Sequence, residues 1–228
     1  MFKYLVLNHI PRCGGSSLRQ SFFVASKTHD YFGSYPIYIS GHSHGNICLY
    51  DNPHYIQSIH KDTLMFIDHS PAFFIEQAFN LNISETYRML TIRNPIDRFI
   101  SHIHFFYKQH IDSISKLSLQ NQIDKFGHMT INYLTMAHNK HKDKSLNAKY
   151  KISQSLLKEY NFIFQVENQH LMEQFNSTNP FAIHIPNFHT NHSPIDSTLP
   201  VLQKTKNFIY KNIKLEIKLL EEFYEMDI

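Results

Sequence analysis

Short apolar runs alternate along this chain with stretches in which apolar side chains recur at helical spacing. We expect strands at residues 2–10, 35–40, 63–68, 87–92, 162–166 and 181–185. Strands that alternate with helices favour a parallel sheet whose faces are covered by helices. The pattern therefore predicts an α/β fold with a central parallel sheet.

The helical pattern is clearest after the first and the fourth expected strands. Residues 16–27 follow the first strand, and residues 97–109 follow the fourth, where Pro95 supplies a start signal for a helix. Residues 108–151 are polar and weakly periodic, so we expect short helices and loops that face the substrate. Residues 201–224 predict a pair of terminal helices packed outside the sheet.

Composition limits the class of protein. The chain has 228 residues, of which 42% are hydrophobic, and this is enough apolar material for one domain spanning residues 1–228. A net charge of +3 is too small for a general nucleic-acid binder, so we expect no nucleic-acid partner. No apolar run approaches the ~18 to 20 residues that span a bilayer, so we expect no integral membrane segment.

The two cysteines, Cys13 and Cys48, are too few for a disulfide framework. Residues 1–15 lack the pattern of a cleaved leader and resemble a first strand. We therefore expect a reduced, cytoplasmic protein. The 17 histidines include several close pairs, but none has a recognised zinc spacing, and we expect no metal.

The segment that joins the first strand to the first helix is rich in groups that bind anions. Gly14 and Gly15 allow the backbone to wrap closely around a phosphate, and Ser16 and Ser17 add hydroxyl donors. Arg12 neutralises negative charge. Because unpaired N–H groups point outward at a helix N-terminus, this junction predicts a phosphate-binding loop.

Two other phosphate chemistries were compared with this loop. A Walker A loop requires Lys directly after its last glycine, and Ser16 stands there instead, so nucleotide hydrolysis of that type is not supported. Cys13 and Arg19 have the C-x5-R spacing of the cysteine phosphatases, in which a thiolate lies inside an anion-binding loop. A phosphatase with this pair is therefore an open alternative.

A second motif lies at the junction after the fourth expected strand and runs from Arg93 to Ser101. Its spacing, R-N-P-x-x-R-x-x-S, follows the family pattern R-[DN]-P-x-x-R-x-x-S, and residues 11–18 follow the pattern P-K-[TS]-G-[GT]-[TS]-[ST]-L. With these motifs the sequence resembles the sulfotransferases that use 3′-phosphoadenosine 5′-phosphosulfate (PAPS). It is most similar to the carbohydrate branch, which includes the heparan and uronyl 2-O-sulfotransferases and many bacterial relatives.

This resemblance implies how the donor is bound. The 5′-phosphosulfate is expected to contact the residues of the first motif, which are Arg12, Cys13, Gly14, Gly15, Ser16, Ser17 and Leu18. The 3′-phosphate is expected to contact Arg93 and Ser101. Arg12 occupies the position of the family lysine, which is expected to stabilise charge on the leaving group, so Arg12 is also a candidate catalytic residue.

The resemblance also implies a general base that removes the proton of the acceptor hydroxyl. The 2-O branch has a Gly-His pair at the end of an early strand, and Gly41 and His42 follow residues 35–40 here. His42 is therefore the expected base, with His44 as a second candidate. Glu167 is expected to have a structural or acceptor-orienting role.

The resemblance thus predicts in-line transfer of a sulfuryl group from PAPS to a hydroxyl, with a carbohydrate as the expected acceptor. The phosphatase alternative explains the first motif but gives the second no role. A non-enzyme alternative also stays open, in which Arg12 in place of lysine has removed catalysis while nucleotide binding persists. The sequence does not identify the acceptor or the oligomeric state.

Overall fold

The computed structural model describes residues 1–13, 15–30, 32–35, 37–39, 62–108, 117–136, 141, 143–168, 170–186 and 200–223. Contacts divide the chain into two compact units. The sheet unit contains Met1–Ile92 and Leu157–Thr190, and the helical unit contains Arg93–Leu156 and Asn191–Ile228. Each unit has its own arrangement and is described by itself.

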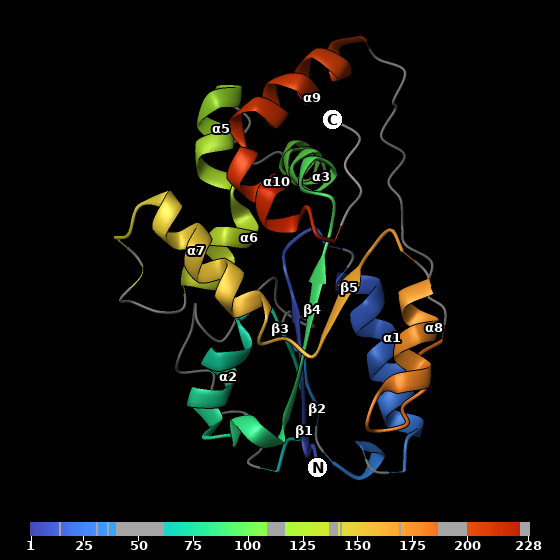
Figure 1. Ribbon diagram of the computed structural model, residues 1–228. Coiled ribbons are helices and arrows are strands. Elements are labelled where there is room, and N and C mark those ends of the chain that lie inside the picture. The colour runs from blue at the N-terminus through green and yellow to red at the C-terminus, as the bar shows by residue number, and fades with distance from the viewer. Residues whose placement is uncertain are drawn as a thin grey trace. The chain divides into compact units, whose positions relative to one another are not determined.

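In the described residues, the sheet unit is built on five parallel strands in the order β2-β3-β1-β4-β5 (Figure 1). The strands are β1 (Tyr4–His9), β2 (Ile37–Ile39), β3 (Met65–Asp68), β4 (Thr86–Ile92) and β5 (Phe162–Gln165). Short 3-10 turns lie at Phe32–Ser34 (η1) and Ile83–Glu85 (η3). The predicted α/β fold with a parallel sheet is confirmed.

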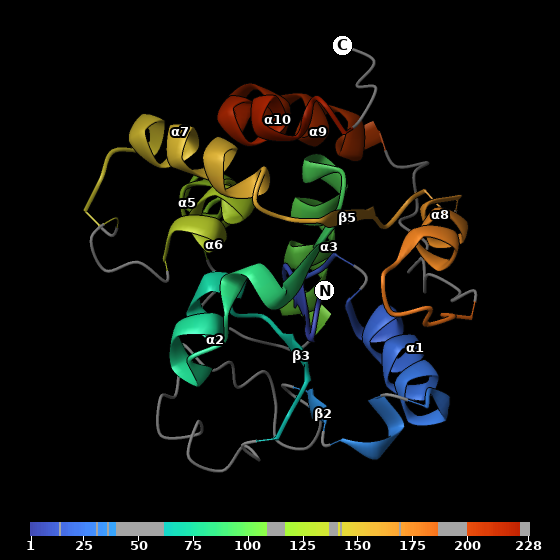
Figure 2. The same cartoon turned by 60° about the horizontal axis from the view of Figure 1, so that its bottom comes forward.

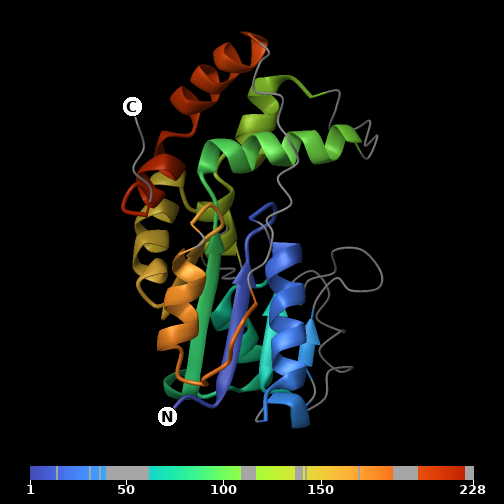
Figure 3. The ribbon, with the colours of Figure 1, turned by 90° about the vertical axis from the view of Figure 1, so that its right-hand side faces the viewer.

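Helices cover both faces of this sheet. Helices α1 (Gly15–Thr28) and α8 (His170–Thr178) lie on one face, and α2 (Ala72–Phe79) lies on the other (Figures 1 and 2). Viewed from the side of α1 and α8, these two helices lie in front of the strands (Figure 3).

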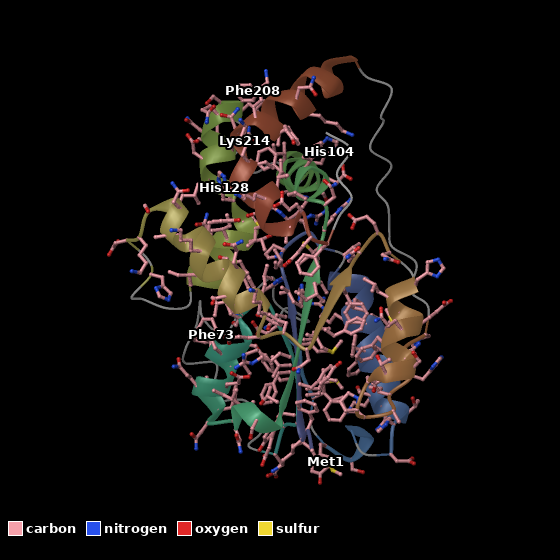
Figure 4. The ribbon with its side chains drawn as sticks, viewed as in Figure 1. Met1, Phe73, His104, His128, Phe208 and Lys214 are labelled. Atoms are coloured by element: carbon pink, nitrogen blue, oxygen red, sulfur yellow. The ribbon has the colours of Figure 1, made fainter. Side chains whose placement is uncertain are left out.

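The alternation of side chains along β1 explains the two layers. Leu5 and Leu7 belong to the apolar cluster shared with α1 and α8, whereas Val6, between them, belongs to the cluster shared with α2. Successive residues of a strand point to opposite faces, so a continuous apolar run is required where both faces are covered. Side chains accordingly fill the space on both sides of the strands (Figure 4).

A buried ion pair joins β4 to α2. Arg88 donates from Nε and Nη2 to the two carboxylate oxygens of Glu76, each at 2.6 Å, and from Nη1 to Glu159 at 2.7 Å. Burial alone lowers the pKa of Arg88, but the bonds to Glu76 and Glu159 prevail and raise it. The guanidinium is therefore held in its charged form in an otherwise apolar layer.

The strand expected at residues 181–185 is not formed, and that prediction is wrong. The segment is irregular, and its buried backbone groups bond to side chains of α8 and the residue after it. Asn179 donates to the carbonyl of Ile183 and accepts from its N–H, at 2.9 and 3.0 Å. Asn176 does the same for Ile185, both at 2.8 Å. Two amide side chains thus replace a neighbouring strand.

The helical unit contains six α-helices in its described residues: α3 (Pro95–Lys108), α5 (Leu119–Phe126), α6 (Met129–Met136), α7 (Leu146–Leu157), α9 (Pro200–Asn212) and α10 (Lys214–Leu220). Its apolar core includes Phe99, Ile123, Ile209 and Ile217. The short helices expected within residues 108–151 and the terminal pair expected within residues 201–224 are therefore present. None of the helices in the described part of the chain is long and apolar enough to cross a membrane.

Candidate functional site

The anion loop, residues 11–18, leaves the end of β1 and enters α1. The N–H of Cys13 donates to the carbonyl of Ile10 at 3.1 Å, which closes a tight turn directly after the strand. Arg12 lies within this turn with φ of 69°, in the left-handed region that is unusual for a residue with a Cβ atom. The side chains of Cys13 and Leu18 are buried, at 0% and 2% exposure.

Helix α1 begins within the anion loop, as the sequence predicts. Gly15, Ser16 and Ser17 are its first residues, and Gly14 lies outside the described residues. The helix has 14 residues and no acidic side chain in its first turn. Its N-terminal N–H groups and the positive end of its dipole are therefore available to attract an anion.

A pair of histidines lies next to the start of this loop. His9 is the last residue of β1, and His69 directly follows β3, the parallel neighbour of β1. Their ring centroids are 3.7 Å apart, and Nδ1 of His69 lies 2.7 Å from the carbonyl oxygen of His9. His9 is 4% exposed, whereas His69 is partly exposed.

The charge state of His9 is set by its surroundings. Burial lowers its pKa well below the ordinary value, and electrostatic interactions with the His69 imidazole and the Arg19 guanidinium lower it further. Arg19 is itself partly buried in α1, and burial lowers its pKa. His9 is therefore neutral at physiological pH.

The turn that carries His69 is fixed by buried polar groups. Asp68 accepts the hydroxyl of Tyr38 at 2.7 Å and the backbone N–H of Ser70. The amide of Asn8 donates to the carbonyl of Ser70. With the bond between His69 and the backbone of His9, these contacts tie the ends of β1, β2 and β3 together.

The second motif belongs to the helical unit. Arg93 directly follows β4, and Asn94 accepts from the N–H groups of Ile96 and Asp97 at 3.0 and 3.3 Å, capping the start of α3. This is the helix start predicted from the sequence. Ser101 lies further along the same helix, and both Arg93 and Ser101 are partly exposed.

Arg98, the second arginine of this motif, is held by groups of other helices in the same unit. It is completely buried, and its Nη2 atom donates to the carbonyls of Phe126 and Gly127 at 3.2 and 3.1 Å. The carboxylate of Glu216 lies 3.7 Å from the same nitrogen. Arg98 therefore joins α3 to the turn between α5 and α6 and to α10.

Strand register relates the starting points of the two motifs. In the pairing of β1 with β4, His9 lies opposite Thr91, so the two strands end side by side at the carboxyl edge of the sheet. The anion loop follows β1, and Arg93 follows β4 in the chain. Ligands of parallel α/β sheets bind outside this edge.

The other predicted site residues are the histidines after the second expected strand and a glutamate after β5. His42 and His44 lie outside the described residues, and Glu167 is exposed shortly after β5. His69 was not among the predicted site residues, although it directly follows the strand expected at residues 63–68. Among the residues the structure describes, no group of three His, Cys, Asp or Glu side chains is arranged to hold a metal ion.

The parallel sheet and the helix that begins within the anion loop define an α/β protein with a candidate site for an anionic ligand. Comparison with protein families is consistent with this class: the model described as "Sulfotransferase family" matches residues 2–228. The chain belongs to the sulfotransferase family, which confirms the prediction of a sulfotransferase. No curated protein and no solved structure matched.

Proposed function

We propose that this protein transfers a sulfuryl group from PAPS to a hydroxyl of a carbohydrate. Family membership across residues 2–228 supports sulfuryl transfer in general. The observation that carries the proposal for the donor is the tight turn that brings Arg12 to the N-terminus of α1, a helix with no acidic residue in its first turn. PAPS supplies an activated sulfuryl group and two anionic ends.

The anion loop is proposed to hold the 5′-phosphosulfate. Backbone N–H groups at the start of α1 would bind its oxygens, together with Arg12 and the hydroxyls of Ser16 and Ser17. The partly buried Arg19 adds positive charge close to His9, at the base of the loop. These groups suit an anion and would disfavour a neutral ligand.

Arg93 and Ser101 are proposed to hold the 3′-phosphate. The adjacent carboxyl ends of β1 and β4 support this assignment, because the anion loop directly follows one of these strands in the chain and Arg93 directly follows the other. The burial of Arg98 supports it in another way. Arg98 is committed to backbone carbonyls, which agrees with the family pattern, in which the first arginine and the serine of the motif contact the phosphate.

Arg12 is proposed to stabilise charge on the oxygen that joins phosphate to sulfur as that bond breaks. Arginine carries the required charge but presents it on a planar fork, whereas the lysine of related proteins presents a point charge. His42 is the base that the family resemblance implies. We further propose that the chain forms a single domain, that the protein is cytoplasmic, and that the reaction requires no metal.

The phosphatase alternative is opposed by the state of Cys13. A cysteine that attacks a phosphate ester lies in a partly exposed, electropositive position, but Cys13 is 0% exposed. The phosphatase alternative also leaves Arg93 and Ser101 without a function. The remaining alternative is a module that binds the nucleotide but has lost catalysis because Arg12 replaces the family lysine. A measurement of sulfuryl transfer distinguishes this alternative from the proposed enzyme.

The donor site is tested by thermal stabilisation with adenosine 3′,5′-bisphosphate, the product that retains both phosphates. A ligand at 100 times its dissociation constant stabilises the folded state by about 2.7 kcal/mol. We expect this stabilisation in the wild type and its loss in Arg93→Ala. Lys211→Ala, an exposed charge on α9 of the same unit, is the matched control and should retain it.

Catalysis is tested by incubating the protein with labelled PAPS on a glycan array. Transfer of the label to a saccharide supports the proposal and excludes a module without catalysis. Absence of both nucleotide binding and transfer contradicts it. Hydrolysis of an aryl phosphate that disappears in Cys13→Ser would establish the phosphatase alternative instead.

A further inference from the structure

We infer that His69, rather than His42, is the residue that accepts the proton of the acceptor hydroxyl, and that His9 positions it. This inference rests on the proposed sulfotransferase function. His69 follows β3, which pairs with β1 in parallel, so it lies at the carboxyl edge of the sheet directly beside the strand that leads into the anion loop. It is partly exposed and therefore accessible from solvent.

The hydrogen bond to His9 determines which nitrogen of His69 is basic. Nδ1 lies 2.7 Å from the carbonyl oxygen of His9, and a carbonyl can only accept, so Nδ1 carries the hydrogen. In a neutral imidazole the other nitrogen, Nε2, then holds the lone pair. A general base requires such a nitrogen in a fixed direction.

The surrounding contacts hold this ring in place. Asp68 and Ser70, on either side of His69, are fixed by Tyr38 and Asn8, and the His9 ring packs against the imidazole at 3.7 Å between centroids. A base whose neighbours are fixed in this way loses little entropy when it meets its substrate. Because the same residue, His9, ends β1, the anion loop and the base are attached to one point of the sheet.

The proton transfer balances with the proposed reaction. The acceptor oxygen forms a bond to sulfur, its proton passes to Nε2 of His69, and the bond between sulfur and the phosphate oxygen breaks. Adenosine 3′,5′-bisphosphate leaves with that electron pair. The His9 ring packs against the resulting imidazolium, Arg19 on α1 acts electrostatically on His9, and Asp68, which precedes His69 in the chain, is hydrogen-bonded to Tyr38.

The substitution His69→Asn separates the two roles of the ring. The Asn amide can still donate to the carbonyl of His9 in place of Nδ1, but it has no nitrogen that accepts a proton. We expect stabilisation by adenosine 3′,5′-bisphosphate to persist while transfer of labelled sulfate falls by ~10²–10⁴-fold. If no glycan accepts the label, the slow release of labelled sulfate from PAPS to water is the rate measured.

Two further variants make the comparison specific. His170→Asn changes an exposed histidine on α8 of the same unit and should leave the rate unchanged. His42→Asn tests the base implied by the family resemblance, and a loss of transfer in this variant without a loss in His69→Asn overturns the inference. Near wild-type transfer by His69→Asn overturns the inference, and so does a parallel loss of transfer and nucleotide stabilisation, which would indicate a structural role.

Nitrogen NMR of the histidine-labelled wild-type protein gives a test that needs no activity. At neutral pH we expect His69 to have a protonated Nδ1 and an unprotonated Nε2. The opposite tautomer overturns the assignment of the base and leaves the proposed function intact. A wild-type protein that neither binds the bisphosphate nor transfers sulfate overturns both.

Discussion

The guanidinium of Arg98 in α3 lies 3.7 Å from the carboxylate of Glu216 in α10, and both side chains are completely buried. Glu216 also accepts the backbone N–H groups of Thr130 and Ile131, at 2.6 and 3.1 Å, at the start of α6. One carboxylate thus holds the buried arginine and caps a helix. The C-terminal helix is therefore part of the framework that supports α3, the helix that carries Ser101.

Glu216→Gln is expected to destabilise the protein by about 3 kcal/mol, because it leaves the charge of Arg98 buried without a compensating carboxylate. Urea unfolding followed by circular dichroism measures this change. Glu221→Gln, an exposed position directly after α10, is the control and should change stability by less than about 0.5 kcal/mol. Equal stability of the two variants would show that the buried pair contributes little.

Local sequence pattern was sufficient for most of the sheet. Where an apolar run was followed by a turn and a helix, as at residues 2–10 and 87–92, the expected strand formed as β1 and β4. Residues 181–185 have a similar pattern but no strand partner, because Asn176 and Asn179 satisfy their backbone groups. A pattern of apolar residues reports burial, and it does not specify which groups will complete the hydrogen bonds.

The residues of the candidate site likewise fall into two groups: those that a local motif predicts and those that only the fold brings together. Arg12, Arg93 and Ser101 are predicted site residues because each belongs to a contiguous motif in the sequence. His69 belongs to no such motif, and its proximity to His9 depends on β3 pairing with β1, a contact between residues about 60 apart. Likewise the motif gave Arg98 no role, because its partners Phe126, Gly127 and Glu216 are distant in sequence.

Asn179→Ala is expected to lower stability by about 2 to 6 kcal/mol. The substitution leaves the buried N–H and carbonyl of Ile183 without the amide that now pairs both of them, and each unsatisfied buried group costs about 1 to 3 kcal/mol. Urea unfolding measures the effect. Ser177→Ala removes only an exposed bond within α8 and is the matched control. A loss below about 1 kcal/mol for Asn179→Ala would contradict this account of the segment.

Substitutions of Arg12 are expected to separate backbone strain from ligand binding. Because φ is 69°, Arg12→Gly relieves about 1 kcal/mol of strain and should be at least as stable as the wild type, yet it should lose most stabilisation by adenosine 3′,5′-bisphosphate. Arg12→Lys keeps both the charge and the strain, so it should retain nucleotide binding. Thermal unfolding with and without the bisphosphate measures both effects. Undiminished binding by Arg12→Gly would remove Arg12 from the site.

The stability of the protein is expected to fall as pH decreases below the ordinary histidine pKa of about 6.5. Burial lowers the pKa of His9 in the folded state, so between its folded and unfolded pKa values the unfolded chain binds more protons. Burial also lowers the pKa of His128, which lies in the helical unit (Figure 4). Each such group contributes a slope of up to about 1.4 kcal/mol per pH unit.

His9→Phe tests the share of this pH dependence that belongs to His9. Phenylalanine retains a ring beside His69 but has no titratable nitrogen, so the slope between pH 7 and pH 5 should decrease by up to one proton while stability at pH 7 changes little. Urea unfolding at several pH values, followed by circular dichroism because the chain has no tryptophan, gives the slope. An identical slope in the variant would mean that His9 is protonated as readily in the folded protein as in the unfolded chain.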